Sequence, residues 1–159
     1  MKKSEVIQAI IARFGEELQT YLNAANASRA EATHESSKAE NKYDTRGLEA
    51  SYLARGQSRQ MAELEQAVLE FRKLAPREFA AGEPIDVGAL VELAQGRERT
   101  FYFIGPRGGG TEVEVNGCEV LVITPQSPLG AQLVGKCAGD ELKLVLPGSQ
   151  NRYRVRAVN

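Results

Sequence analysis

The sequence predicts an α+β protein in which a long antiparallel helical hairpin, a coiled coil folded back on itself, precedes a β-rich domain. Two observations predict the hairpin. Residues 1–75 contain no proline, and two heptad-spaced rows of apolar or small residues flank an almost wholly polar stretch from Glu35 to Gly47. A third observation predicts the second domain, because the pattern beyond Pro76 changes to short alternating segments that are typical of strands.

The two rows have the spacing of coiled-coil seams, with large residues at the ends remote from the polar stretch and small ones close to it. The first row is Ile7, Ile11, Phe14, Leu18, Tyr21, Ala25, Ser28 and Ala32, and the second is Ala50, Ala54, Gln57, Met61, Leu64, Val68 and Phe71. Small residues bury little apolar area, so we expect a slender hairpin near its turn. A dimerisation coiled coil is the alternative interpretation of the same pattern.

A linker is predicted over residues 76–84, because Pro76, Gly82 and Pro84 disfavour helix. The domain from residue 85 to residue 159 is expected to form a small antiparallel sheet with one short helix in a crossover, Pro128 to Val134. The predicted strands are Val87–Leu93, Arg99–Ile104, Thr111–Val115, Glu119–Thr124, Glu141–Leu146 and Arg152–Arg156.

Charge and targeting signals narrow the class of protein. Twenty Lys and Arg against 21 Asp and Glu give a net charge of −1, which argues against a non-specific nucleic-acid binder. The longest strictly apolar run near the start, Ala9 to Ala12, is too short for a signal peptide or a membrane span. Cys118 and Cys137 lack zinc-like spacing and favour a reducing compartment. We therefore expect a cytoplasmic protein that does not bind a membrane.

Catalytic signatures are weak. The single histidine, His34, excludes a His-rich metal cluster and a nucleophilic triad, and we interpret it as a solvated helix residue. The glycine-rich run from Gly105 to Gly110 precedes no Lys-Ser/Thr pair, so it predicts a loop between strands and not a phosphate-binding loop.

The C-terminal half carries a specific motif. The segment Ile123-Thr124-Pro125-Gln126-Ser127-Pro128-Leu129-Gly130-Ala131-Gln132-Leu133-Val134-Gly135-Lys136, followed by Gly139-Asp140-Glu141, resembles the signature of the GreA/GreB transcription elongation factors. The stretch Lys38 to Tyr43 is similar to the hairpin tip of that family. Ser127 would cap the short helix and Pro128 would suit its first position, so the motif also has an architectural interpretation.

The resemblance implies a fold and a function. The C-terminal domain would have an FK506-binding-protein-like fold without isomerase activity, and the protein would be a monomer that binds bacterial RNA polymerase. The hairpin would enter the secondary channel while the globular domain holds the channel rim, with indirect contact to nascent RNA. Acidic tip residues would help to hold a second Mg²⁺ shared with the polymerase, so that the polymerase cleaves backtracked RNA. The protein would bind no cofactor alone. As an accessory factor that acts through the polymerase active site, it would not itself be an enzyme.

The predicted tip departs from the family pattern of Asp-x-x-Glu followed by Asn. One alignment keeps Glu40 and Asn41 but places Ser37 at the Asp, and another places Ser36 and Ala39 at the two acidic positions. The acidic candidates at the tip are Glu35, Glu40 and Asp44, and of these Glu40 and Asp44 are the candidate Mg²⁺ ligands. The candidates for other contacts of the tip are Lys38, Asn41, Tyr43 and Arg46. Two functions stay open within the family, namely cleavage stimulation and a regulatory paralogue that blocks the channel without promoting cleavage.

Candidate contacts outside the tip complete the predictions. The polymerase-docking candidates are Ser127, Pro128, Leu129, Gly135 and Lys136. Arg152, Arg154 and Arg156 would share one strand face, which is either solvated or in contact with a nucleic acid or an acidic polymerase surface. A function of a different class, a dimeric coiled-coil adaptor that binds other proteins, is the further alternative.

Overall fold

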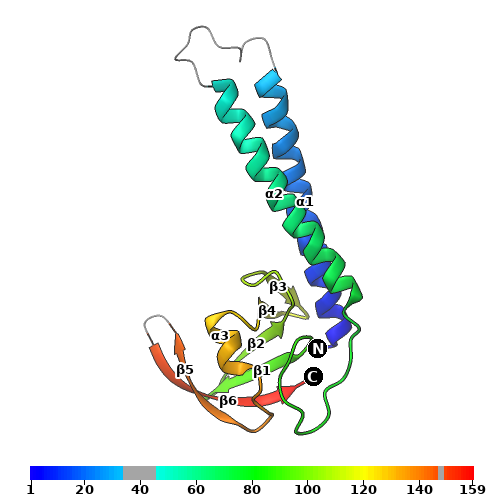
Figure 1. Cartoon of the computed structure of the whole chain (residues 1–159). Helices are drawn as coiled ribbons and strands as arrows, with labels where there is room; N and C mark the ends of the chain where they lie inside the picture. Colours follow the sequence, from blue (N-terminus) through cyan, green and yellow to red (C-terminus); the bar gives the residue numbers. More distant parts are fainter. Residues whose placement is uncertain (34–45, 147–148) are drawn as a thin grey trace. The chain divides into compact units, whose positions relative to one another are not determined.

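The computed structural model describes the backbone of residues 1–33, 46–146 and 149–159, and most of the side chains within these ranges. Two long helices, α1 (Lys3–Thr33) and α2 (Arg46–Lys73), precede six strands and one short helix (Figure 1). The α+β class predicted from the sequence is confirmed. Among the described helices, none combines the length and the apolar character needed to cross a bilayer.

The chain forms two compact units, one of residues 13–68 and one that combines residues 1–12 with residues 69–159. The first and last turns of the helical pair therefore fold with the sheet. The sequence-based boundaries at residues 75 and 85 follow the change from helix to strand, and as domain limits they stay a prediction.

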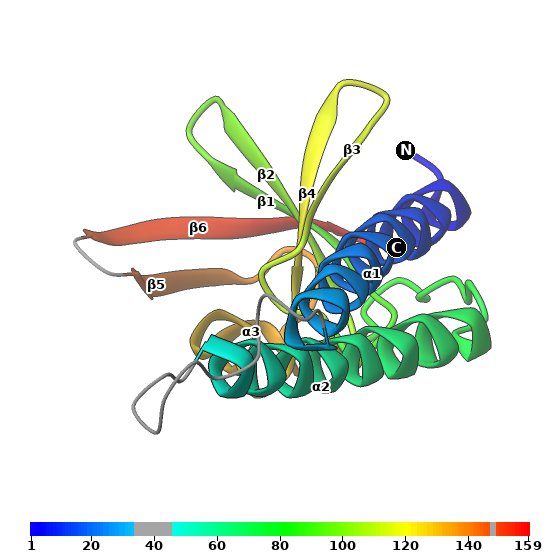
Figure 2. The same ribbon diagram turned by 90° about the horizontal axis from the view of Figure 1, so that it is seen from above.

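In the unit of residues 13–68, α1 and α2 lie side by side and run in opposite directions (Figures 1 and 2). Phe14, Ala25 and Ala67 are buried. The other described members of the predicted rows in this unit, Leu18, Tyr21, Met61, Leu64 and Val68, are partly buried. The heptad spacing therefore identified the buried stripe of each helix. On the exposed surface of α1, Arg13 forms an ion pair with Glu17 at 3.2 Å.

The other unit contains a six-stranded sheet of order β3-β4-β2-β1-β6-β5. The strands are β1 (Leu90–Gln95), β2 (Glu98–Ile104), β3 (Glu112–Val115), β4 (Cys118–Ile123), β5 (Glu141–Leu146) and β6 (Ser149–Val158). The prediction of an antiparallel sheet was wrong at one pair, because β2 and β4 are parallel, with Phe103 beside Val122. The hairpin β3–β4 folds back so that β4 follows β2 in direction.

The first and last strands differ most from their predicted bounds. The prediction of strand from Val87 was wrong by three residues, since Gly88 has φ +91° and Ala89 N–H donates to the Asp86 carbonyl in a turn. The last strand is longer than predicted and pairs with both β1 and β5. The predicted crossover helix is confirmed as α3 (Pro128–Leu133), which connects β4 to the edge strand β5 across the sheet.

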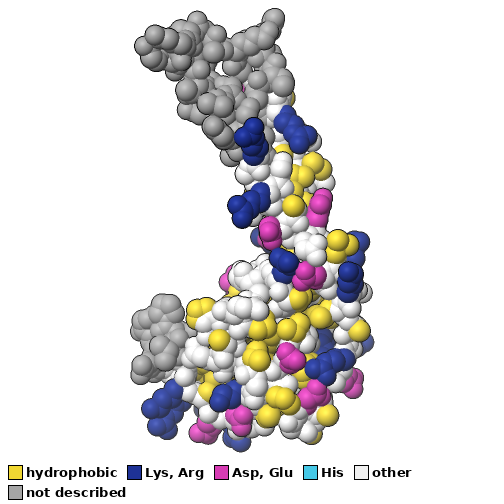
Figure 3. All heavy atoms as spheres, viewed as in Figure 1, with side chains coloured by type: hydrophobic (Ala, Val, Ile, Leu, Met, Phe, Trp, Pro, Cys, Tyr) yellow, Lys and Arg dark blue, Asp and Glu magenta, His cyan; other side chains and the backbone are white. Residues whose placement is uncertain are grey.

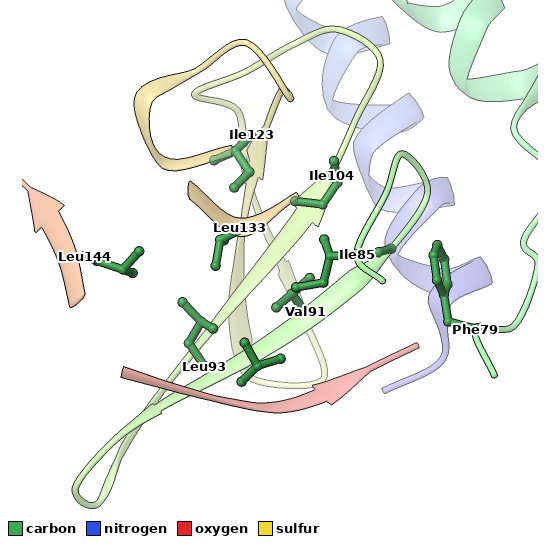
Figure 4. Close-up of a cluster of buried hydrophobic side chains, with 10 residues drawn as sticks. Phe79, Ile85, Val91, Leu93, Ile104, Ile123, Leu133 and Leu144 are labelled. Carbon is green, nitrogen blue, oxygen red and sulfur yellow. The ribbon is translucent and has the colours of Figure 1, made fainter. Parts of the chain in front are cut away.

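One face of the sheet packs on α3. The core on this face contains Phe79, Ile85, Ala89, Val91, Leu93, Ile104, Ile123, Leu133, Leu144 and Val155, and its labelled members point into one cluster in Figure 4. Leu133 of α3 is fully buried there. The alternating residues of each strand point to the opposite face.

Part of that opposite face packs against the first turns of α1 and the last turns of α2. Phe71 and Phe103 have ring centroids 5.8 Å apart and are both fully buried. Gly105 follows β2 at a point where any Cβ atom would lie 2.7 Å from the Phe71 ring, so only glycine fits. Asn116, in the β3–β4 turn, donates to Glu5 of α1 at 3.1 Å.

The linker of residues 76–84 is held to α1 by a buried lysine. The Lys3 ammonium donates to the Arg77 carbonyl and lies 4.7 Å from the centroid of the buried Phe79 ring, while the Arg77 guanidinium lies 4.1 Å from the same ring. Arg77 also pairs with Glu83 at 2.5 Å. Burial, with repulsion from Arg77 as the second cause, lowers the pKa of Lys3.

Phe71→Ala should destabilise the sheet unit by about 3–5 kcal/mol, because it leaves a cavity against Phe103 and Gly105. Leu69→Ala is the matched control, since Leu69 is 49% exposed and its loss should cost far less. Hydrogen exchange of the β1 and β2 amides in the full chain measures the effect on this unit. Equal acceleration of exchange in both variants would contradict the packing described here.

The buried ammonium of Lys3 should make stability depend on alkaline pH. Because the folded state binds this proton more weakly than the unfolded chain, the free energy of unfolding should rise as pH increases from the folded pKa to the unfolded value of about 10.4. Lys3→Met keeps the aliphatic stem and should remove that rise. Urea denaturation of both proteins at a series of pH values measures it, and parallel profiles would contradict the assignment.

Candidate docking site at the α3 turn

The structure brings the five predicted docking residues to the two ends of α3. Ser127 caps the start of the helix, Pro128 and Leu129 form its first turn, and Gly135 and Lys136 follow its last residue. Six residues of helix span about 9 Å, so both groups belong to one small surface.

The start of α3 is fixed by a pair of hydrogen bonds on one hydroxyl group. Ser127 has extended backbone angles, φ −66° and ψ 152°, and its Oγ accepts from the Gly130 N–H at 3.0 Å. The same Oγ donates to the Thr124 carbonyl at 2.7 Å. Pro128 follows at the first helical position, where its missing N–H removes no intrahelical hydrogen bond. The predicted capping roles of Ser127 and Pro128 are therefore confirmed.

Gly130 is essential to this turn, and the sequence analysis did not single it out. A Cβ atom at Gly130 would lie 1.9 Å from the Thr124 carbonyl oxygen and 2.9 Å from Ser127 Oγ. Only glycine allows the helix to fold so closely onto the end of β4. A glycine inside a helix only six residues long was the available signal, because glycine disfavours helix unless close packing requires it.

Backbone hydrogen bonds tie the end of α3 to Ile85, the first residue after the linker. Gly135 has φ +84° and its N–H donates to the Ile85 carbonyl at 2.9 Å, while the Ile85 N–H donates to the Lys136 carbonyl at 2.7 Å. The Cys137 thiol lies 3.3 Å from the Gly82 carbonyl. These contacts hold Gly135 in the left-handed conformation and fix the direction in which the chain leaves the helix.

Burial separates anchoring residues from residues that a partner can reach. Leu129 and Leu133 pack into the core, and Ser127 is half-buried. Pro128, Ala131 and Lys136 are exposed, and Lys136 places an ammonium group on this surface. These three residues therefore form an exposed surface that carries one ammonium group. Within the ranges that the structure describes, no group of three or more His, Cys, Asp or Glu side chains is placed to hold a metal ion.

The predicted hairpin-tip residues lie outside the described part of the chain. They are Glu35, Lys38, Glu40, Asn41, Tyr43 and Asp44, together with His34. Arg46 is the first residue of α2, and its side chain is also outside the description. The tip contacts and the Mg²⁺ ligands Glu40 and Asp44 therefore stay predictions.

The remaining predicted residues are on the sheet. Arg152, Arg154 and Arg156 of β6 are exposed, as the alternation of this strand predicts. Cys118 and Cys137 are free thiols, and both are partly buried. Both basic and acidic side chains are exposed on the surface shown in Figure 3, in accord with the balanced composition.

No protein-family model matches the chain. A curated protein, the transcription elongation factor GreA of Allorhizobium ampelinum, is 29% identical over 82 residues, which are 50% of this chain and 48% of that protein. The chain thus spans about half the length of this relative.

Solved structures with a similar course of the chain include GreA factor homolog 1 (Gfh1) of Thermus thermophilus, with 22% identity, 94% of each chain covered and a TM-score of 0.41. Gfh1 of Thermus aquaticus gives 23% identity, 95% and 94% coverage and a TM-score of 0.40. The GreA/GreB factor of Nitrosomonas europaea gives 20% identity, covers 70% of this chain and 91% of its own, and has a TM-score of 0.38.

The GreA match covers 82 residues at 29% identity. It confirms the predicted resemblance: this chain is similar to the transcription elongation factors of the GreA/GreB family.

Proposed function

We propose that this protein binds bacterial RNA polymerase and modulates transcript elongation, with its helical hairpin in the secondary channel and the α3 surface on the channel rim. The observation that carries the proposal is the α3 turn itself. The backbone of this turn is fixed by Ser127, Gly130 and Gly135. It holds the exposed residues Pro128 and Lys136 in defined positions at the two ends of α3. The similarity to GreA supports polymerase as the partner.

We assign a separate role in polymerase binding to each of the two compact units. The sheet unit supplies the docking surface, and the helical unit of residues 13–68 supplies an arm with a narrow, small-residue stripe around Ala25. Two linked contacts bind more tightly than either does alone. The factor would act on the polymerase active site and would need no catalytic residues of its own.

The composition of the tip favours the channel-blocking form of this function. Glu40 and Asp44 can offer carboxylate oxygens to a Mg²⁺ ion shared with the polymerase, but Ser36 or Ser37 stands where the family motif has Asp. Mg²⁺ loses its hydration water reluctantly, so one carboxylate fewer weakens its retention. We therefore expect channel occupancy with weak stimulation of cleavage.

Lys136→Glu should weaken binding to RNA polymerase roughly tenfold or more, because it reverses the charge at the exposed end of the docking surface. Lys143→Glu is the matched control. Lys143 is an exposed lysine of β5 next to Arg152, on the face of the sheet opposite to α3. Competition binding to an elongation complex measures both variants. A similar affinity for the two, or weaker binding of the control alone, would place the docking surface elsewhere.

Glu40→Ala and Asp44→Ala should leave the affinity for polymerase within about twofold of the parent, because the proposal assigns docking to the α3 surface and not to these carboxylates. Transcript cleavage in a stalled, backtracked complex should fall in both variants, and added Mg²⁺ should partly restore cleavage in the parent. Glu31→Ala, on the exposed surface of α1, is the control. Strong stimulation of cleavage by the parent that neither substitution reduces would show that the carboxylates do not hold the ion.

A further inference from the structure

The face of the sheet opposite to α3 is only partly covered, and its uncovered part is rich in arginine. We define the arginine face as Arg99 of β2 and Arg152, Arg154 and Arg156 of β6. The strand register places these residues together, because Arg154 is opposite Ala94 of β1, and Ala94 is opposite Arg99. All four arginines are exposed.

A half-buried carboxylate organises two of these arginines. Glu92 of β1, whose side chain is 15% exposed, directs one oxygen to both Arg99 and Arg156, at 3.4 Å and 3.2 Å. The pairing of β1 with β6 shifts register between Glu92 and Leu93, so that Arg156 is the extra residue of a bulge and lies beside Glu92. One carboxylate thus positions two cations and leaves a net positive charge.

Arg152 and Arg154 add further positive charge. The structure places Lys143 opposite Arg152 and Glu141 opposite Arg154, but among the described residues no ion pair involves either arginine. Side chains two residues apart on a strand lie about 6.6 Å from one another on the same face, a spacing comparable to that of consecutive phosphates along an extended strand. Guanidinium groups bind phosphate oxygens in a bidentate manner.

An aromatic ring lies beside the cations. Phe101 is opposite Glu92 on the same face and is partly exposed. Together with Arg99 it lines an open cleft of about 580 Å³ next to β4. The cleft lies where the hairpins β1–β2 and β3–β4 spread apart, because β2 pairs with β4 only from Phe101 onward (Figure 2). A flat base can therefore reach the ring from the cleft.

We propose that the arginine face binds single-stranded nucleic acid, with the arginines on successive phosphates and a base stacked on Phe101. The aromatic ring distinguishes this ligand from an acidic protein segment, which would use the cations but has no need of a stacking platform. The balanced charge of the whole chain does not oppose the site, since the excess of positive charge is local. The site is separate from the α3 surface and does not depend on polymerase binding.

The test is fluorescence anisotropy of a labelled ten-nucleotide oligo(U) with the full chain over a series of KCl concentrations. The logarithm of the binding constant should fall linearly with the logarithm of the KCl concentration. Each phosphate contact should make that slope steeper by about 0.7. The double variant Arg152→Gln/Arg154→Gln removes no ion pair of the described fold and should reduce the slope by about 1.4. Arg59→Gln, on the exposed surface of α2 in the other compact unit, should change neither affinity nor slope.

The role of the ring is tested separately. Phe101→Leu keeps an apolar side chain on the sheet and should weaken oligo(U) binding roughly fivefold or more without changing the salt slope. Its binding to a poly-glutamate peptide should equal that of the parent. The proposal is overturned if the parent does not bind oligo(U) at 50 mM KCl, or if poly-glutamate competes as well as oligo(U) does. An equal loss of binding in Arg59→Gln and the double variant would also overturn it.

Discussion

The sheet of this protein has two faces to bury, and the packing of those two faces determines most of the other features. Ile104 and Phe103 are neighbours in β2 and point to opposite sides. Ile104 belongs to the core that α3 covers, while Phe103 packs on Phe71 at the end of α2. Each face therefore needs a covering element that approaches closely, and glycine provides the space in both cases.

The two close approaches have different consequences for function. Gly105 admits the Phe71 ring and so joins the last turns of α2 to the sheet. Gly130 admits the Thr124 carbonyl and so fixes α3 at the end of β4. Because backbone atoms and buried side chains satisfy these constraints, Pro128 and Lys136 can stay exposed on the surface. On the part of the opposite face that the ends of α1 and α2 do not cover, β6 exposes Arg152, Arg154 and Arg156.

Local chemistry made much of the fold predictable. Heptad spacing identified the buried stripe through Phe14 and Ala25, and Ser127-Pro128 identified the start of α3, because caps and seams depend on residues close in sequence. The parallel pairing of β2 with β4 was not predictable in this way, since register across distant strands depends on tertiary packing. The bulge that brings Arg156 to Glu92 and the contact of Gly130 with Thr124 are likewise properties of the folded chain.

The central claim is that the α3 surface contacts RNA polymerase. Its most direct test is site-specific photocrosslinking, with a photoreactive amino acid placed at position 136 or at position 143 and the full chain bound to an elongation complex. Residue 136 lies at the exposed end of α3, and residue 143 lies on the opposite face of the sheet. The account predicts a crosslink to a polymerase subunit from position 136 and little from position 143. A crosslink from position 143 alone would contradict it.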